Sequence, residues 1–245
     1  MYLKQIVAAI LLSILSLGSF AQSLRIAAAS SMVDFLEEIK PKFEATHPQS
    51  LEIITNSSGT LANQIKNGAP FDIFLSADQK YTTLLHQEGF GVSAPVTFAY
   101  NKLILYTKKD IAADQVHDYL AGTECTNIGI AQPDLAPFGN AARKYLTQIK
   151  VLDDISNKLI YGQNISIVNQ YIYTHSVDAA FTSLSSKNKL SSKVACCWIE
   201  LSSETAPALP QSALILNDST RDFLDYLRND NNAKSIIQKY GYLNN

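Results

Sequence analysis

Apolar and polar positions along the chain follow two periods in turn, which predicts strands that alternate with helices. Short apolar runs are typical of buried strands, whereas apolar residues three and four positions apart indicate one face of a helix. The runs interpreted as strands are 24–28, 51–55, 71–75, 99–107, 127–131, 179–183 and 213–216. The segments interpreted as helices are 31–43, 60–67, 78–87, 138–146, 165–173, 220–228 and 232–239.

Local signals refine the ends of these elements. Ser31 and Asp34 match a loose capping box at the start of the first helix. Pro41 predicts a kink or a restart in that helix, because proline removes a backbone donor. Gly68 is a natural residue to follow a helix end. The strand and helix alternation predicts an α/β fold of mostly parallel sheets with helices on both faces. We expect 202–211, which contains two prolines, to be a surface connection between lobes.

The first 21 residues have the pattern of an export signal. Lys4 supplies a positive start, 6–17 is apolar apart from two serines, and 19–21 fits the small-x-small cleavage pattern. The apolar run is shorter than the roughly 20 residues of a membrane-spanning helix, although an uncleaved anchor is the alternative. We therefore expect cleavage near Ala21 and a periplasmic or extracellular chain that starts near Gln22.

Charge and length narrow the classes of function. Removal of 21 residues from 245 leaves 224, enough for one large α/β domain or two lobes. The formal charge of −2 becomes −3 without Lys4, since 19 basic residues then face 22 acidic ones. A mildly acidic chain lacks the basic footprint of a nucleic-acid-binding protein, so no nucleic-acid partner is expected.

Cysteines and histidines predict no metal centre. Three cysteines in an exported chain imply one disulfide with one free thiol, or no disulfide. Adjacent Cys196 and Cys197 pair only with strain, so Cys125 with either of them is the better pairing. The spacing of these residues is not that of a zinc site, and the four histidines are scattered.

Four polar segments lead directly into predicted helices without any arginine, lysine or histidine, at 29–32, 56–60, 136–140 and 162–166. A helix N-terminus offers unpaired N–H groups and a partial positive charge, which together attract anions. Four such turns predict an anion pocket made of dipoles and hydroxyls. Because hydroxyls and N–H groups donate and no carboxylate is placed there, the pattern favours a fully deprotonated oxyanion. The nucleophile elbow, P-loop and dinucleotide fingerprints are missing from the sequence, so catalysis is not expected.

Several of these segments resemble the periplasmic molybdate-binding proteins of ABC transporters. The most specific is Gly-Ala-Pro-Phe-Asp-Ile-Phe-Leu-Ser-Ala-Asp at 68–78. The resemblance extends over essentially the whole mature chain and also rests on 27–30, 57–62, 133–139 and 239–242.

The resemblance implies a two-lobed, type II periplasmic binding protein with the ligand in the cleft between lobes. The expected lobes are 22–98 with 204–245, and 99–203. In such a protein, serine hydroxyls of one lobe and backbone N–H groups of the other hold a tetrahedral dianion. The matching positions in this sequence are Ser30, Ser58, Phe138, Ile165 and, in place of a tyrosine found in some relatives, Ser183. Asp72, Asp78 and Asp134 are expected to have structural roles.

The resemblance also implies the ligand and the partners. We expect molybdate, and with it tungstate, to be captured and delivered to a membrane permease and ATPase by a monomer without a cofactor. Sulfate has the same charge and shape, so the preference for molybdate rests on the resemblance. The alternatives are a binding protein for another oxyanion or a small organic acid, and a secreted α/β hydrolase.

Overall fold

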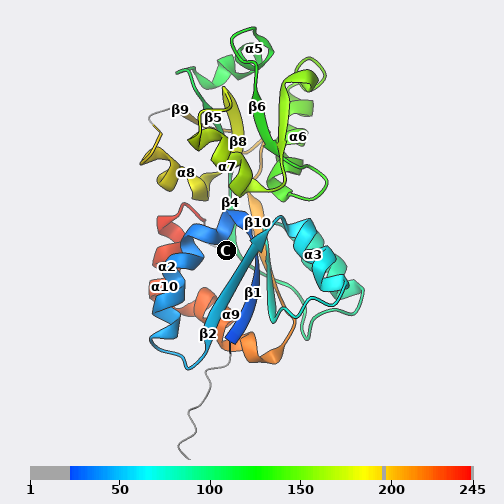
Figure 1. Cartoon of the computed structure of the whole chain (residues 1–245), viewed down its shortest axis with the longest axis vertical. Helices are drawn as coiled ribbons and strands as arrows, with labels where there is room; N and C mark the ends of the chain where they lie inside the picture. The colour runs from blue at the N-terminus through cyan, green and yellow to red at the C-terminus, as the bar shows by residue number, and fades with distance from the viewer. Residues whose placement is uncertain (1–22, 195–196, 244–245) are drawn as a thin grey trace, which may run out of the picture.

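The computed structural model describes residues 23–194 and 197–243, and these form two lobes, each built on a five-stranded sheet (Figure 1). The first sheet has the order β2-β1-β3-β10-β4, with β1 Ser23–Ala29, β2 Ser50–Asn56, β3 Ile73–Ser76, β4 Val96–Asn101 and β10 Leu209–Ile215. The second sheet has the order β7-β6-β8-β5-β9, with β5 Leu103–Thr107, β6 Ile128–Ala131, β7 Leu159–Gly162, β8 Ala179–Ser183 and β9 Cys197–Glu200. The predicted two-lobed α/β fold is confirmed. The predicted export signal lies outside the described residues.

Helices cover both faces of the first sheet. Its helices are α2 Val33–Glu44, α3 Ser58–Lys66, α4 Lys80–Gln87, α9 Arg221–Asn229 and α10 Asn231–Lys239, and the turn η1 Ser30–Met32 joins β1 to α2. Alternate residues of β1 face opposite ways: Ala27 packs in a cluster with Leu61 of α3 and Leu85 of α4, whereas Ile26 belongs to the cluster that contains Phe35 of α2. The second lobe carries α5 Val116–Ala121, α6 Pro137–Gln148, α7 Ile165–Tyr173 and α8 Leu184–Ser191.

Each described sheet is mostly parallel, as predicted, but contains one strand, β10 or β5, that runs against the others. In the described strands, β1 pairs in parallel with β2 and β3, and β6 with β7 and β8, whereas β10 and β5 pair antiparallel with both of their neighbours. The reason is the path between the lobes. β4 leaves the first sheet, the chain turns at Lys102, and β5 enters the second, so the predicted strand 99–107 is two strands. β10 returns from the second lobe and runs opposite to β3 and β4.

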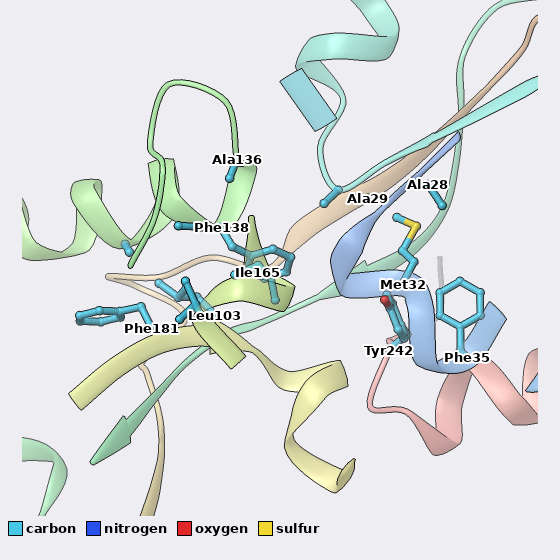
Figure 2. Packing of buried hydrophobic residues seen from close by; sticks show 14 of the residues in the cluster. Ala28, Ala29, Met32, Phe35, Leu103, Ala136, Phe138, Ile165, Phe181 and Tyr242 are labelled. Carbon is cyan, nitrogen blue, oxygen red and sulfur yellow. The ribbon is translucent and has the colours of Figure 1, made fainter. Parts of the chain in front are cut away.

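The two lobes share one buried apolar cluster at their junction. Phe138, Ile165 and Leu103 of the second lobe belong to the same cluster as Ala29 and Met32 of the first (Figure 2). The parallel strands of both sheets end at this junction. The polar turns that follow those strands are therefore brought together, as expected for the ligand edge of an α/β sheet.

Local details differ from the sequence-based expectations at several places. Helix α2 continues through Pro41 to Glu44, although the proline has no N–H to donate to the carbonyl four residues earlier. The predicted connection 202–211 ends early, since β10 already begins at Leu209. Pro210 is accommodated beside an irregularity in register at the next residue. Periodicity did not identify β7, β9, α5 or α8. In the described part of the chain, no helix is both long and apolar enough to span a membrane.

Candidate functional site

Residues from all four polar turns line one small cavity between the lobes. Four of the five predicted site residues are among them: Ser30, Ser58, Phe138 and Ile165. These four residues are between 0% and 4% exposed, so the cavity lies among buried residues. The full lining consists of Ala29, Ser30, Ser31, Asn56, Ser57, Ser58, Ala77, Ala136, Pro137, Phe138 and Ile165.

The cavity has the size of a small ion. The space open to the centre of a water molecule is about 10 Å³. A sphere of that volume has a radius of about 1.3 Å, and adding about 1.4 Å for water gives a cavity radius of about 2.7 Å. Sites for larger organic ligands enclose roughly 300–1,000 Å³. The cavity itself therefore has the scale of one compact ion.

The hydroxyls of Ser30 and Ser58 are both free to donate. Ser30 Oγ accepts from the N–H of Ser166 at 3.4 Å, and Ser58 Oγ accepts from the N–H of Ala77 at 3.1 Å. Neither hydroxyl finds an acceptor for its own hydrogen among the described residues. A hydroxyl whose oxygen already accepts one bond has its hydrogen left for a ligand. The bond to Ser166 also crosses from one lobe to the other.

The start of α6 lines the cavity. Pro137 occupies the first turn and has no N–H, so Phe138 is the first residue of the helix that can donate. The N–H of Asn140 is the next to bond within the helix, to Ala136 O at 2.9 Å. Gly139 allows the helix to start directly against β6, because a Cβ there would lie 2.1 Å from Ala131 O.

The start of α7 contributes a second N–H group. Asn164 caps this helix by accepting from the N–H of Ile167 at 3.2 Å, and the N–H of Ser166 bonds to Ser30 Oγ. The N–H of Ile165, by contrast, has no acceptor among the described residues. Phe138 and Ile165 therefore offer donors from the second lobe opposite the serines of the first.

Ser31 was missed as a site residue. Its Oγ is buried and has no hydrogen-bond partner in the described part of the chain, and the residue lines the cavity. The predicted capping box is wrong, since neither η1 nor α2 has a side-chain cap and Asp34 pairs with Lys189 of α8 at 2.5 Å. The serine doublet after β1 was the available signal, but local spacing assigned the second serine to the helix.

Ser183 does not line the cavity. Its side chain is fully buried at the end of β8, where its hydroxyl pairs with Ser185 Oγ and Ser186 Oγ, each at 2.9 Å. The structure thus brings the other four predicted residues together and places Ser183 in a separate cluster of hydroxyls.

Direct bonds between the lobes surround the cavity. The N–H of Gly59 donates to Leu135 O at 2.8 Å, and Tyr81 Oη donates to Asp134 O at 2.8 Å. A Cβ at Gly59 would lie 2.8 Å from Leu135 O and 2.7 Å from Tyr81 Oη. Glycine is therefore required at position 59 for this close approach of the lobes.

The described cavity lining contains no charged side chain. Among the described residues that line it, none carries a titratable group. Asp78 follows the lining residue Ala77, but its carboxylate accepts from Ser76 Oγ at 3.1 Å, and burial raises its pKa. Asp72 bonds the N–H of Arg25, and Asp134 pairs with Arg143, so both serve the fold. An anion in the cavity would thus meet donors and dipoles, with no carboxylate in contact.

No described cysteine lines the cavity. Cys125 is a fully buried free thiol, so its predicted pairing with Cys197 is not formed, and burial raises its pKa to about 12. Cys196 lies outside the described residues. Across 23–194 and 197–243, no three His, Cys, Asp or Glu side chains are grouped to hold a metal ion.

Comparisons with known proteins identify the family and the fold. The family described as bacterial extracellular solute-binding protein matches residues 24–243. The molybdate-binding protein ModA of Azotobacter vinelandii is 27% identical over 246 residues, with 98% of this chain and 97% of the relative covered. The solved periplasmic molybdate-binding protein of A. vinelandii has a TM-score of 0.82 at 25% identity, covering 90% of this chain and 98% of that one.

A more distant structure shares the fold alone. The periplasmic binding protein AfuA of Actinobacillus pleuropneumoniae, with fructose 6-phosphate bound, has a TM-score of 0.72 at 13% identity, covering 90% of this chain and 83% of that one. The match of the family over nearly the whole described chain, together with the cavity between two lobes, leads to one assignment. The chain belongs to the family of bacterial extracellular solute-binding proteins.

Proposed function

We propose that this protein captures a fully deprotonated tetrahedral oxyanion, molybdate and with it tungstate, for an ABC transporter. One observation carries the proposal: two serine hydroxyls and two first-turn N–H groups, all without acceptors among the described residues, line one ion-sized cavity. Donors of this kind stabilise negative charge without any counter-charge.

The donor set also argues for the protonation state of the ligand. Phosphate near neutral pH carries a proton that requires an acceptor, whereas molybdate, tungstate and sulfate require donors alone. The described cavity lining provides no carboxylate acceptor. The choice of molybdate among the three draws on the names of the relatives in A. vinelandii.

The family description supports a setting outside the cytoplasm. We propose that the leader is removed near Ala21 and that the mature protein works outside the cytoplasmic membrane as a monomer. Its two lobes would dock together on a permease coupled to an ATPase. The family is one of transport proteins, and we assign this chain no catalytic role and no cofactor.

Calorimetric titration of the purified exported chain with molybdate, tungstate, sulfate and phosphate tests the proposal. We expect a one-to-one complex with molybdate and with tungstate, and much weaker binding of phosphate. Phosphate binding as tight as molybdate, or no heat with any of the four anions, contradicts the proposal.

A second candidate is a small organic anion. A cavity of about 310 Å³ shares Ala136 and Pro137 with the ion-sized one, and Lys80 and Lys144 lie in its wall. An organic phosphate could place its head in the small cavity and its remainder in the larger one. Glycerol phosphate added to the same titration decides between the two, because tighter binding than molybdate would favour this candidate.

A further inference from the structure

The carbonyl of Ser31 is a point where the two lobes meet. It accepts one hydrogen bond from Tyr242 Oη of the first lobe and one from Ser185 Oγ at the start of α8 in the second lobe, each at 2.9 Å. The same residue contributes its own unpartnered Oγ to the cavity wall. Ser185 therefore reaches, from across the lobe boundary, the backbone that carries a cavity-lining hydroxyl.

Ser185 is itself held in one orientation. Its Oγ accepts from Asn101 Nδ2 at 2.9 Å, and Asn101 is the last residue of β4, where the chain crosses between lobes. The Ser183 hydroxyl lies 2.9 Å from the same oxygen. With Asn101 donating to it, the Ser185 hydroxyl has its hydrogen available for the Ser31 carbonyl.

Burial makes these bonds depend on the contact between lobes. Ser183 and Asn101 are fully buried, and Ser185 and Ser31 are 2% and 5% exposed. When the lobes separate, the bond from Ser185 to Ser31 is lost, whereas the bond from Tyr242 stays within the first lobe. A buried hydrogen bond is a small net gain over the bonds to water that replace it, so the Ser185 bond favours the arrangement in which the lobes meet.

We propose that Ser185 is a positioning residue for the oxyanion cavity. It fixes the Ser31 carbonyl, and with it the turn η1 that presents the hydroxyls of Ser30 and Ser31, once the lobes close on the ligand. Ser185 does not line the cavity and makes no contact with the ligand. The inference rests on the proposed function and adds a residue that couples closure to the shape of the binding site.

The test compares Ser185→Ala with Ser186→Ala in the purified exported chain. Ser186 is the matched control, since it is the next residue of α8, is 3% exposed, and pairs with Ser183 and Asn169 but not with Ser31. Molybdate affinity, the rate of molybdate release and the thermal midpoint without ligand are measured for each. We expect Ser185→Ala to bind about tenfold more weakly through faster release, as for loss of one buried hydrogen bond.

For Ser186→Ala we expect affinity within about twofold of the unmodified chain, at a similar change in thermal midpoint. Ser185→Cys retains a weaker donor at the same place and is expected to give an intermediate affinity, which keeps the test decisive if the alanine variant folds poorly. Equal affinity losses in the two alanine variants, or no loss in Ser185→Ala, overturn the inference. If the unmodified chain binds none of the four anions, the proposed function fails, and the inference fails with it.

Discussion

At the scale of single residues, the site depends on which atom of each serine is already used. Ser30 Oγ and Ser58 Oγ each accept a backbone N–H, so their hydrogens are left for a ligand. Ser57, the residue before Ser58, caps α3 instead, because its Oγ accepts from the N–H of Thr60 at 3.3 Å. Identical side chains thus have different roles because their neighbours differ.

Ser30→Ala and Ser58→Ala should each weaken molybdate binding. Loss of a hydrogen bond to a charged group costs about 1.5–3 kcal/mol, which is roughly 10- to 150-fold in affinity. Titration calorimetry measures the effect. Ser212→Ala is the control, because this buried serine pairs with Thr82 Oγ1 and does not line the cavity. Unchanged affinity in both site variants would remove these serines from the site.

Gly59→Ala should lower molybdate affinity. The added Cβ would meet Leu135 O of the other lobe, which opposes closure, and Tyr81 Oη of α4, which must shift within the first lobe. Alanine favours a helix over glycine by up to about 1 kcal/mol, which offsets part of this strain in the chain without ligand. Calorimetry should therefore show a loss of affinity larger than the loss of thermal stability without ligand, and equal losses in both would indicate a folding defect instead.

At the scale of elements, helix starts supply the donors and helix faces hold the lobes together. α6 and α7 direct Phe138 and Ile165 toward the turns after β1 and β2. On another side of the junction, Lys189 of α8 pairs with Asp34 of α2, and this bond raises the pKa of Lys189. The pair joins the lobes without touching the cavity.

Lys189→Gln should weaken molybdate binding modestly and in a salt-dependent way. The lysine side chain is 52% exposed, so solvent screens the pair and its contribution is about 0–1 kcal/mol, or up to roughly fivefold in affinity. Above about 0.5 M salt the difference from the unmodified chain should disappear, since screening then acts within a few ångströms. A difference that persists at high salt would assign the effect to packing.

Asp178, which precedes β8, should make the second lobe sensitive to acid. Burial tends to raise its pKa, but bonds from Thr126 N–H, Thr126 Oγ1 and Asn127 N–H, with Lys108 nearby, lower it overall. A lowered pKa in the folded state stabilises the fold above the unfolded value of about 3.9, and this stability is lost as the pH falls through the folded value.

Chemical unfolding of Asp178→Asn at several pH values measures the stability that the Asp178 carboxylate contributes. The variant should be less stable than the unmodified chain by about 1.5–3 kcal/mol at pH 7, with the difference shrinking below about pH 4. A difference that stays constant from pH 7 to pH 3 would show that the charge of Asp178 is not responsible.

At the scale of the whole molecule, an ion-sized cavity lies between the two lobes, and its described lining contains no titratable side chain. No protein proton then has to move when a fully deprotonated anion binds. Molybdate affinity should stay flat from about pH 6 to 8, where histidine is the ordinary side chain to titrate. A steep change in calorimetric affinity within that range would reveal an acidic or basic group at the site.

The sequence by itself determined the α/β alternation and the turns that carry chemistry. Period and caps are local properties, so they identified the starts of α6 and α7 and the helix end at Gly68, whose φ of +82° suits glycine. The resemblance then named Ser30, Ser58, Phe138 and Ile165, which the structure brings into one cavity.

The tertiary structure decided which polar groups of each turn form hydrogen bonds within the protein and which remain available for a ligand. The hydrogen bond between Ser166 and Ser30 joins residues 136 positions apart, and the bond between Ser185 and Ser31 joins residues 154 positions apart. A local sequence pattern cannot predict contacts at such separations. For that reason Ser31 was assigned to a cap, and Ser183 to the site. The mixed sheets have the same origin, because strand direction follows from how the chain crosses between lobes, which depends on packing and not on periodicity.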